Sequence, residues 1–141
     1  MKKVVLAALL ATFAAGAAAA DKISFGVSAT YPPFESLDAS NQIVGFDLDL
    51  AKALCKQMQA DCTFTNHAFD SLIPALKFKK YDAVISGMDI TPERSKQVSF
   101  TDPYYANSAV VIAKKDAFKS FAELKGKRIG MENGTTHQKY L

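Results

Sequence analysis

The sequence has little net charge and, after its first twenty residues, no long apolar run. Its formal charge of +3 falls to +1 once Lys2 and Lys3 are set aside with a predicted export signal. So small a charge argues against nucleic acid or an anionic membrane surface as a partner. No later apolar stretch approaches the roughly 20 residues that a membrane-spanning helix needs. We therefore expect the chain after the signal to be soluble.

Several motifs of catalysis and metal binding are missing as well. The sequence contains no phosphate-binding glycine-rich loop, no nucleophile elbow and no arguable serine–histidine–acid set. Its only cysteines, Cys55 and Cys62, lack the further cysteine or histidine ligands of a zinc site. In an exported protein an even cysteine count predicts a disulfide, and one pairing is possible. We predict a Cys55–Cys62 bridge, and no catalytic residue, metal or cofactor.

The N-terminal segment has the three parts of a secretory signal. Lys2 and Lys3 form a positive region, residues 4–15 an apolar region, and residues 18–20 a small-residue cleavage site. We predict cleavage after Ala20 and export to the periplasm.

The most informative stretch is residues 81–100, with the sequence YDAVISGMDITPERSKQVSF. Residues 83–85 are a short apolar run typical of a strand buried on both faces. Thr91 and Pro92 are typical of a helix start, at the N-cap and the first helical position. In open α/β sheets, the loop between a strand and the following helix is where ligands bind.

The loop that follows this strand carries two opposite charges, Asp89 and Arg94, beside Ser86 and Gly87. A guanidinium can hold a carboxylate through two parallel hydrogen bonds, and a carboxylate can hold an ammonium group. Together the two charges match the two ends of a free amino acid. An ordinary salt bridge between Asp89 and Arg94, or two solvated charges, remains an equal alternative at this point.

The remaining pattern predicts an α/β fold. Residues 22–27 alternate, with Ile23, Phe25 and Val27 on one face. A helix follows Gly45, and Leu50, Leu54 and Met58, with Ala51 and Cys55 beside them, form an apolar stripe that faces a sheet. Further strands are predicted at residues 62–65, 98–100, 109–113 and 127–131, and helix starts near residues 70 and 135.

Four more side chains are candidates because they lie where a predicted strand ends or a helix begins: Tyr31, Phe69, Thr135 and Thr136. Tyr31 follows the first strand in a loop stiffened by two prolines, and Phe69 precedes a helix. Packing at a rim would also explain Tyr31, and filling of the core would also explain Phe69.

Four segments together resemble the periplasmic substrate-binding proteins of polar amino-acid ABC importers: GVSATYPPFES, IVGFDLDLAKALC, AFDSLIPALKFKKYDAVISGMDITPERSKQVSFTDPYY and LKGKRIGMENGTT. The resemblance implies the two-lobed periplasmic-binding-protein fold of type II. Residues 21–108 would form most of lobe one, and residues 109–141 the crossover and the beginning of an incomplete lobe two. The resemblance also implies that the protein is a monomer and that it delivers an amino acid to a membrane permease.

The resemblance assigns roles to individual residues. Arg94 would clamp the ligand α-carboxylate with help from Thr136 and its neighbour Thr135, and Asp89 would hold the α-ammonium group. Ser86 and Gly87 would contribute from their loop, Gly87 through its backbone. Tyr31 and Phe69 resemble the aromatic pair of the family and would enclose the ligand side chain. Ser28 replaces an aspartate of relatives that accept lysine and histidine.

Aromatic faces stack on a planar guanidinium better than on an ammonium group. The predicted ligand is therefore L-arginine or a related basic amino acid. Two alternatives stay open. A periplasmic enzyme resembling cyclohexadienyl dehydratase would need a general acid, and Asp89 looks committed to a cation. The ligand-sensing lobe of a receptor would need a membrane span.

Overall fold

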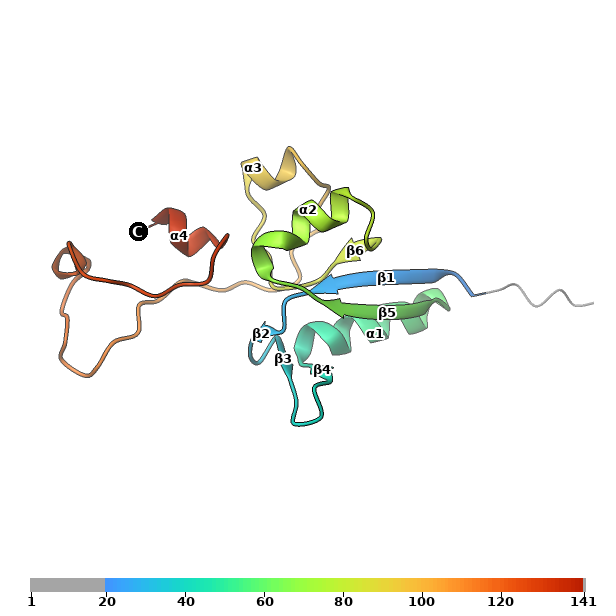
Figure 1. Cartoon of the computed structure of the whole chain (residues 1–141), viewed down its shortest axis with the longest axis horizontal. Coiled ribbons are helices and arrows are strands. Elements are labelled where there is room, and N and C mark those ends of the chain that lie inside the picture. Colours follow the sequence, from blue (N-terminus) through green and yellow to red (C-terminus); the bar gives the residue numbers. More distant parts are fainter. Residues whose placement is uncertain (1–19, 141) are drawn as a thin grey trace, which may run out of the picture.

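The computed structural model describes residues 20–140. It has a parallel three-stranded sheet made of β1 (Lys22–Val27), β5 (Asp61–Asn66) and β6 (Ala83–Val84), in the order β5-β1-β6. Helices cover both faces of this sheet (Figure 1). The predicted α/β class is confirmed, and the predicted export signal falls outside the described residues except for Ala20.

One face of the sheet is covered by α1 (Phe46–Met58). The alternating residues of β1 face this helix, where Phe25 and Val27 pack with Leu48, Ala51 and Cys55. A strand with apolar side chains at every second position buries one whole face, so the predicted alternation of β1 is confirmed.

The inward face of α1 differs in part from the predicted stripe. Leu54 and Met58 are 49% and 52% exposed, whereas Leu48 and Ala51 are buried. Cys55 is buried too, and its disulfide to Cys62 joins that side of the helix to β5. The predicted inward positions of Ala51 and Cys55 are therefore confirmed, and those of Leu54 and Met58 are wrong.

The other face of the sheet is covered by a 3₁₀ turn (η1, Phe69–Ser71) and α2 (Leu72–Lys77). Tyr81 lies buried between α2 and β1, and its hydroxyl donates to the Leu72 carbonyl over 2.7 Å. Its ring lies directly over Gly26, where an added Cβ would be 2.3 Å from the nearest ring atom. Only glycine therefore fits at this point of β1.

A second, antiparallel sheet follows β1 along the chain, made of β2 (Thr30–Tyr31), β3 (Glu35–Leu37) and β4 (Ile43–Val44). The turn between β3 and β4 is held by Asp38, whose Oδ1 accepts from the amides of Ser40 and Gln42 over 2.7 and 2.9 Å. β3 and β4 thus form a short antiparallel ribbon that ends at the start of α1.

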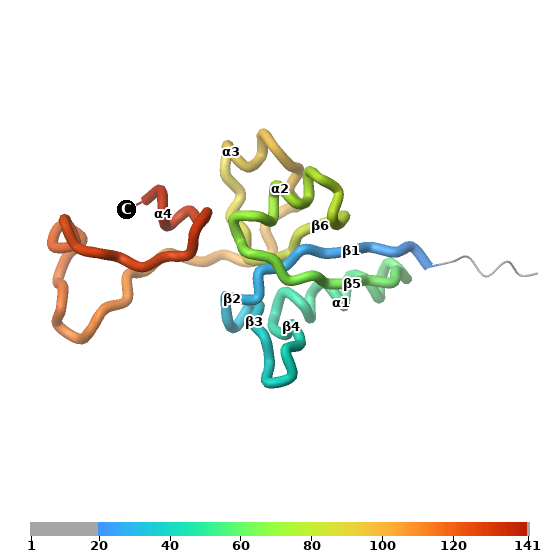
Figure 2. Tube along the Cα trace, viewed as in Figure 1, coloured from blue at the N-terminus to red at the C-terminus, as the bar shows by residue number. Residues whose placement is uncertain are grey.

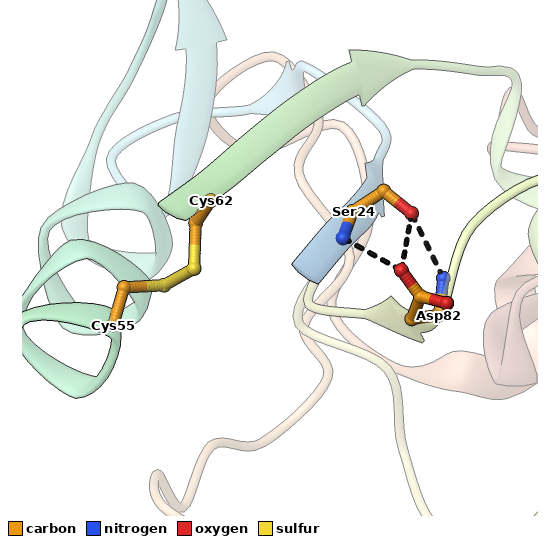
Figure 3. The surroundings of a disulfide bond; sticks show 4 residues. All are labelled: Ser24, Cys55, Cys62 and Asp82. Carbon is orange, nitrogen blue, oxygen red and sulfur yellow. Dashed lines mark hydrogen bonds between the residues drawn. A yellow bond between two sulfur atoms is a disulfide. The ribbon is translucent and has the colours of Figure 1, made fainter. Parts of the chain in front are cut away.

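Two contacts secure the amino ends of the sheet strands (Figure 3). The predicted disulfide joins Cys55 of α1 to Cys62 of β5, with 6.2 Å between the Cα atoms. The Asp82 carboxylate accepts from the amide and hydroxyl of Ser24 over 2.8 and 2.6 Å. These contacts lie at the end of the sheet opposite to the carboxyl ends of its strands.

Beyond β6 the chain forms α3 (Pro92–Ser95), η2 (Phe121–Leu124) and α4 (Thr136–Tyr140). Thr91 caps α3 as predicted, since its Oγ1 accepts from the Arg94 amide over 3.2 Å. The strands predicted at residues 98–100, 109–113 and 127–131 are wrong, because these residues carry no strand. A segment becomes a strand only when a neighbour pairs with its backbone, and within residues 20–140 these three segments have no such partner.

The trace of these later residues runs away from the sheet and returns with α4 (Figure 2). Among residues 20–140, no helix has both the length and the apolar character to cross a membrane. The division into lobes at residue 108 stays a prediction.

We predict that Gly26→Ala destabilises the fold by about 1–3 kcal/mol, because the Tyr81 ring cannot move without breaking its buried hydrogen bond to Leu72. Urea unfolding would measure the loss. Gly130→Ala is the matched control, since an added Cβ there meets nothing within 4 Å. Equal stability of the two variants would contradict the close packing of Tyr81 on β1.

Candidate functional site

The candidate site lies where the strands of the parallel sheet end. The amide of Ser28, directly after β1, donates to the Ser86 hydroxyl oxygen over 2.9 Å. The neighbouring amide of Ala29 donates to Asn66 Oδ1, at the end of β5, over 2.9 Å. These side-chain hydrogen bonds extend the pairing of the strands beyond the last backbone pair. They connect the segments after β1, β5 and β6 at one edge of the sheet.

A cavity of about 460 Å³ opens at this edge and contains every predicted ligand-binding residue. Those nine residues are Ser28, Tyr31, Phe69, Ser86, Gly87, Asp89, Arg94, Thr135 and Thr136. Six further residues complete the lining: Thr30, Glu35, Asn107, Ala109, Glu132 and His137. Residues more than 100 positions apart in the sequence therefore surround one space.

Arg94 is held in place by backbone carbonyls. Its Nη1 donates to the Asp89 carbonyl over 2.7 Å, and its Nη2 donates to the Gly134 carbonyl over 3.0 Å. A guanidinium has five N–H donors, so others stay available for a ligand. Burial lowers the pKa of Arg94, the Asp89 charge opposes that shift, and the group remains a cation at any ordinary pH.

Whereas Arg94 is held by backbone carbonyls, the Asp89 carboxylate is held by a side chain. Its Oδ2 accepts a hydrogen bond from the Thr136 hydroxyl in α4. Within residues 20–140 the only ion pair is the exposed one between Lys139 and Glu93, so the salt bridge considered for Asp89 and Arg94 does not form. A carboxylate has about four acceptor positions, and Asp89 keeps acceptor capacity for a cation in the cavity.

The two predicted aromatic residues occupy different surroundings. Phe69 lies under the Arg94 guanidinium, with 5.5 Å between the guanidinium carbon and the ring centroid. Tyr31 stacks on Phe34 with 5.1 Å between centroids, and its ring also closes over Gly87. At Gly87 the backbone φ is +48°, and an added Cβ would be 3.2 Å from that ring. Glycine is needed there for both conformation and space.

Glu132 is a site residue that the sequence analysis missed. One of its carboxylate oxygens accepts from the Thr30 hydroxyl over 2.7 Å, and Thr30 Oγ1 lies 3.2 Å from Ser28 Oγ. A signal was available, because Glu132 directly follows the strand predicted at residues 127–131, as Ser28 follows β1.

Glu35 and Asp47 were missed as well, and both are almost fully buried, with exposed fractions of 1% and 0%. Glu35 lies in β3 and accepts from the Ser86 hydroxyl over 2.7 Å. Asp47, in the first turn of α1, accepts from the Gly87 amide over 2.8 Å and from the Tyr104 hydroxyl over 3.0 Å. Acids early in a helix are common for electrostatic reasons, so nothing in the sequence marked this one as buried.

Burial also changes the ionisation of these groups. It raises the pKa of Glu35 to about 8, with Asp47 and Glu132 adding to the shift and the Ser86 hydrogen bond opposing it. Burial raises the pKa of Tyr104 too, and the neighbouring Asp47 adds to that shift. At neutral pH, therefore, Glu35 is uncharged and the Tyr104 hydroxyl is a donor.

A larger cavity of about 650 Å³ lies beside the site and shares Tyr31, Ser86, Gly87, Asp89 and Asn107 with it. Most of its lining comes from residues 82–90 and 98–105, and it includes neither Arg94 nor Glu132. Opposite charges converge on the smaller cavity, which is the stronger candidate. Among residues 20–140, no cluster of three or more histidine, cysteine or acidic side chains could hold a metal ion.

Residues 23–136 match the family model of the bacterial extracellular solute-binding proteins, family 3. The chain belongs to this family. Its sequence is 84% identical, over all 141 residues, to the ABC transporter arginine-binding protein 1 of Escherichia coli (strain K12), of which it covers 58%.

Two solved structures agree with this assignment. A Salmonella typhimurium periplasmic binding protein, described for its high arginine specificity, is 63% identical with a TM-score of 0.84, over 86% of this chain and 55% of the other. An ancestral arginine-binding protein bound to arginine is 40% identical with a TM-score of 0.75, over 84% and 54%. The fold is therefore the periplasmic-binding-protein fold, and the chain spans a little over half the length of these relatives.

Proposed function

We propose that the chain binds an L-amino acid with a cationic side chain, L-arginine in particular, for uptake by an ABC importer. The observation that carries this proposal is the set of three charged side chains, Arg94, Asp89 and Glu132, that line one cavity. The three charges sum to −1, which complements an amino acid of net charge +1.

Arg94 and Asp89 suit the two ends that all amino acids share. The guanidinium of Arg94, held by two carbonyls, can bind a carboxylate through its remaining donors. Asp89 can bind the α-ammonium group while Thr136 keeps its carboxylate in place. In this proposal Thr136 and Thr135 close the polar end of the cavity, and Ser86 and Gly87 form its floor.

Glu132 supplies the selectivity for a cationic side chain. A neutral amino acid would leave its carboxylate without a charged partner, and an acidic one would be repelled. Ser28, next to it through Thr30, adds only a hydroxyl. Tyr31 and Phe69 offer aromatic faces on which a planar guanidinium packs better than an ammonium group does.

The relatives support the same ligand and setting. The Escherichia coli relative is named as an ABC transporter arginine-binding protein, and the Salmonella typhimurium structure is described for its arginine specificity. We infer export to the periplasm and delivery of the ligand to a membrane permease. These relatives are named for binding and not for catalysis, so the dehydratase alternative gains no support from them.

We predict that Arg94→Lys weakens arginine binding at least tenfold, because a lysine keeps the charge but loses the planar donor set. Isothermal titration calorimetry would measure the affinity. Arg128→Lys is the matched control, since Arg128 is exposed and lies outside the cavity lining. An Arg94→Lys affinity within about twofold of wild type would exclude Arg94 as the carboxylate clamp.

We predict that Glu132→Gln weakens arginine binding by about 1.5–3 kcal/mol, which is roughly ten- to a hundredfold, because a charge-assisted hydrogen bond is lost. Binding of glutamine, which has no cationic side chain, should change by less than about threefold. Competition titrations with the two ligands would measure this selectivity.

Glu123→Gln is the control for this prediction, since Glu123 is exposed and does not line the cavity. Equal losses for arginine and glutamine in Glu132→Gln would show that Glu132 supports the cavity without recognising the side chain.

A further inference from the structure

Two carboxyl side chains lie buried beneath the cavity with no basic partner. Glu35 comes from β3 and Asp47 from α1, and they hold two consecutive residues, since Glu35 accepts from the Ser86 hydroxyl and Asp47 from the Gly87 amide. The only ion pair within residues 20–140 involves neither of them. Each also has one buried oxygen without a hydrogen-bond partner, Glu35 Oε2 and Asp47 Oδ1. Burying two unpaired negative charges is costly, and one shared proton removes one charge and satisfies both oxygens.

The two remaining oxygens hold the floor of the cavity. Glu35 Oε1 accepts from the Ser86 hydroxyl, whose oxygen in turn accepts from the Ser28 amide. Asp47 Oδ2 accepts from the Gly87 amide and from the Tyr104 hydroxyl. The two acids therefore hold Ser86 and Gly87 at the floor of the cavity, and Asp47 also binds Tyr104 from a later segment.

Among residues 20–140, the side chains that act on the Glu35 carboxyl are acids and a hydroxyl, and none of them is basic. Asp47 faces it from α1, Ser86 from the loop after β6, and Glu132 is a further negative charge across the cavity. Tyr104 reaches the pair through Asp47. Arg94 and His137 line the same cavity but make no hydrogen bond or ion pair with the carboxyls. Nothing in this environment compensates a second negative charge.

We propose that Glu35 and Asp47 act as a positioning pair that shares one proton and holds Ser86 and Gly87 in the ligand-binding conformation. Loss of that proton makes the two carboxylates repel each other, which displaces the floor and weakens ligand binding. This proposal rests on the proposed function, because it concerns the same cavity.

The direction of the pH dependence follows from the buried glutamate. Burial raises the pKa of Glu35 from 4.5 to about 8, so the folded state holds this proton more tightly than the unfolded chain does. The free energy of unfolding therefore falls as the pH rises from about 4.5 to 8, and it loses nothing further from this group above that range. Ligand affinity falls mainly above pH 8, where the folded protein itself loses the proton.

Glu35→Gln tests the proposal, because a glutamine amide can donate to Asp47 and accept from Ser86 as the protonated acid does, at every pH. The control is Asp49→Asn, which removes one exposed carboxylate two residues from Asp47 in the same helix. Arginine affinity would be measured by calorimetry from pH 6 to 9 for all three proteins. Comparing proteins at the same pH cancels the titration of arginine itself.

We expect wild type and Asp49→Asn to lose about tenfold in affinity relative to Glu35→Gln between pH 7 and pH 9, as expected when only the protonated form binds tightly. At pH 7, Glu35→Gln should bind within about threefold of wild type. A pH profile of Glu35→Gln that parallels wild type would overturn the proposal.

Two further measurements do not depend on the ligand. The melting temperature of the ligand-free wild type should fall relative to Glu35→Gln between pH 6 and 8, and equal profiles would count against the shared proton. Infrared difference spectra of the wild type between pH 7 and 9 should show loss of a protonated carboxyl band, and no such loss would overturn the proposal even if the variant fails to fold. Absence of arginine binding at every pH would instead refute the proposed function.

Discussion

The hydroxyl of Ser86 holds the site together. It accepts from the Ser28 amide at the end of β1 and donates to Glu35 in β3. One atom thus connects the parallel sheet, the small antiparallel sheet and the loop after β6. Because Ser28, Glu35 and Ser86 are all buried, water does not compete for these bonds, and a lost partner would leave a polar group unsatisfied.

The rest of the cavity depends on this connection. Gly87 follows Ser86 and takes a conformation that leaves its amide directed at Asp47 and its Cα against Tyr31. Asp89 and Arg94 follow along the same loop, and residues 132–136 meet them across the cavity through Gly134 and Thr136. The contacts below the cavity are therefore buried, whereas those that Asp89 and Arg94 make with residues 134 and 136 are exposed.

Most of the candidate site could be predicted from the sequence, because loops at the carboxyl ends of parallel strands converge whatever the details of packing. Asp89, Arg94, Ser86 and Gly87 lie in one such loop, and the structure gathers all nine predicted residues in one cavity. Their roles toward a ligand stay proposals. Glu132 was missed although its position directly after a predicted strand was informative. Glu35 was missed because a short ribbon gives no sign of which side chain turns inward.

The sequence by itself determined the α/β class, the alternation in β1, the Thr91 cap and the disulfide, since each follows from local patterns or from a single possible pairing. Tertiary structure alone decided which face of α1 is buried, and it left residues 98–100, 109–113 and 127–131 without strand partners. It also decided that acids from β3 and α1 are buried together below the cavity, and within residues 20–140 neither of them has an ion-pair partner. Such contacts join distant segments, and local propensity carries no information about what a side chain meets across the fold.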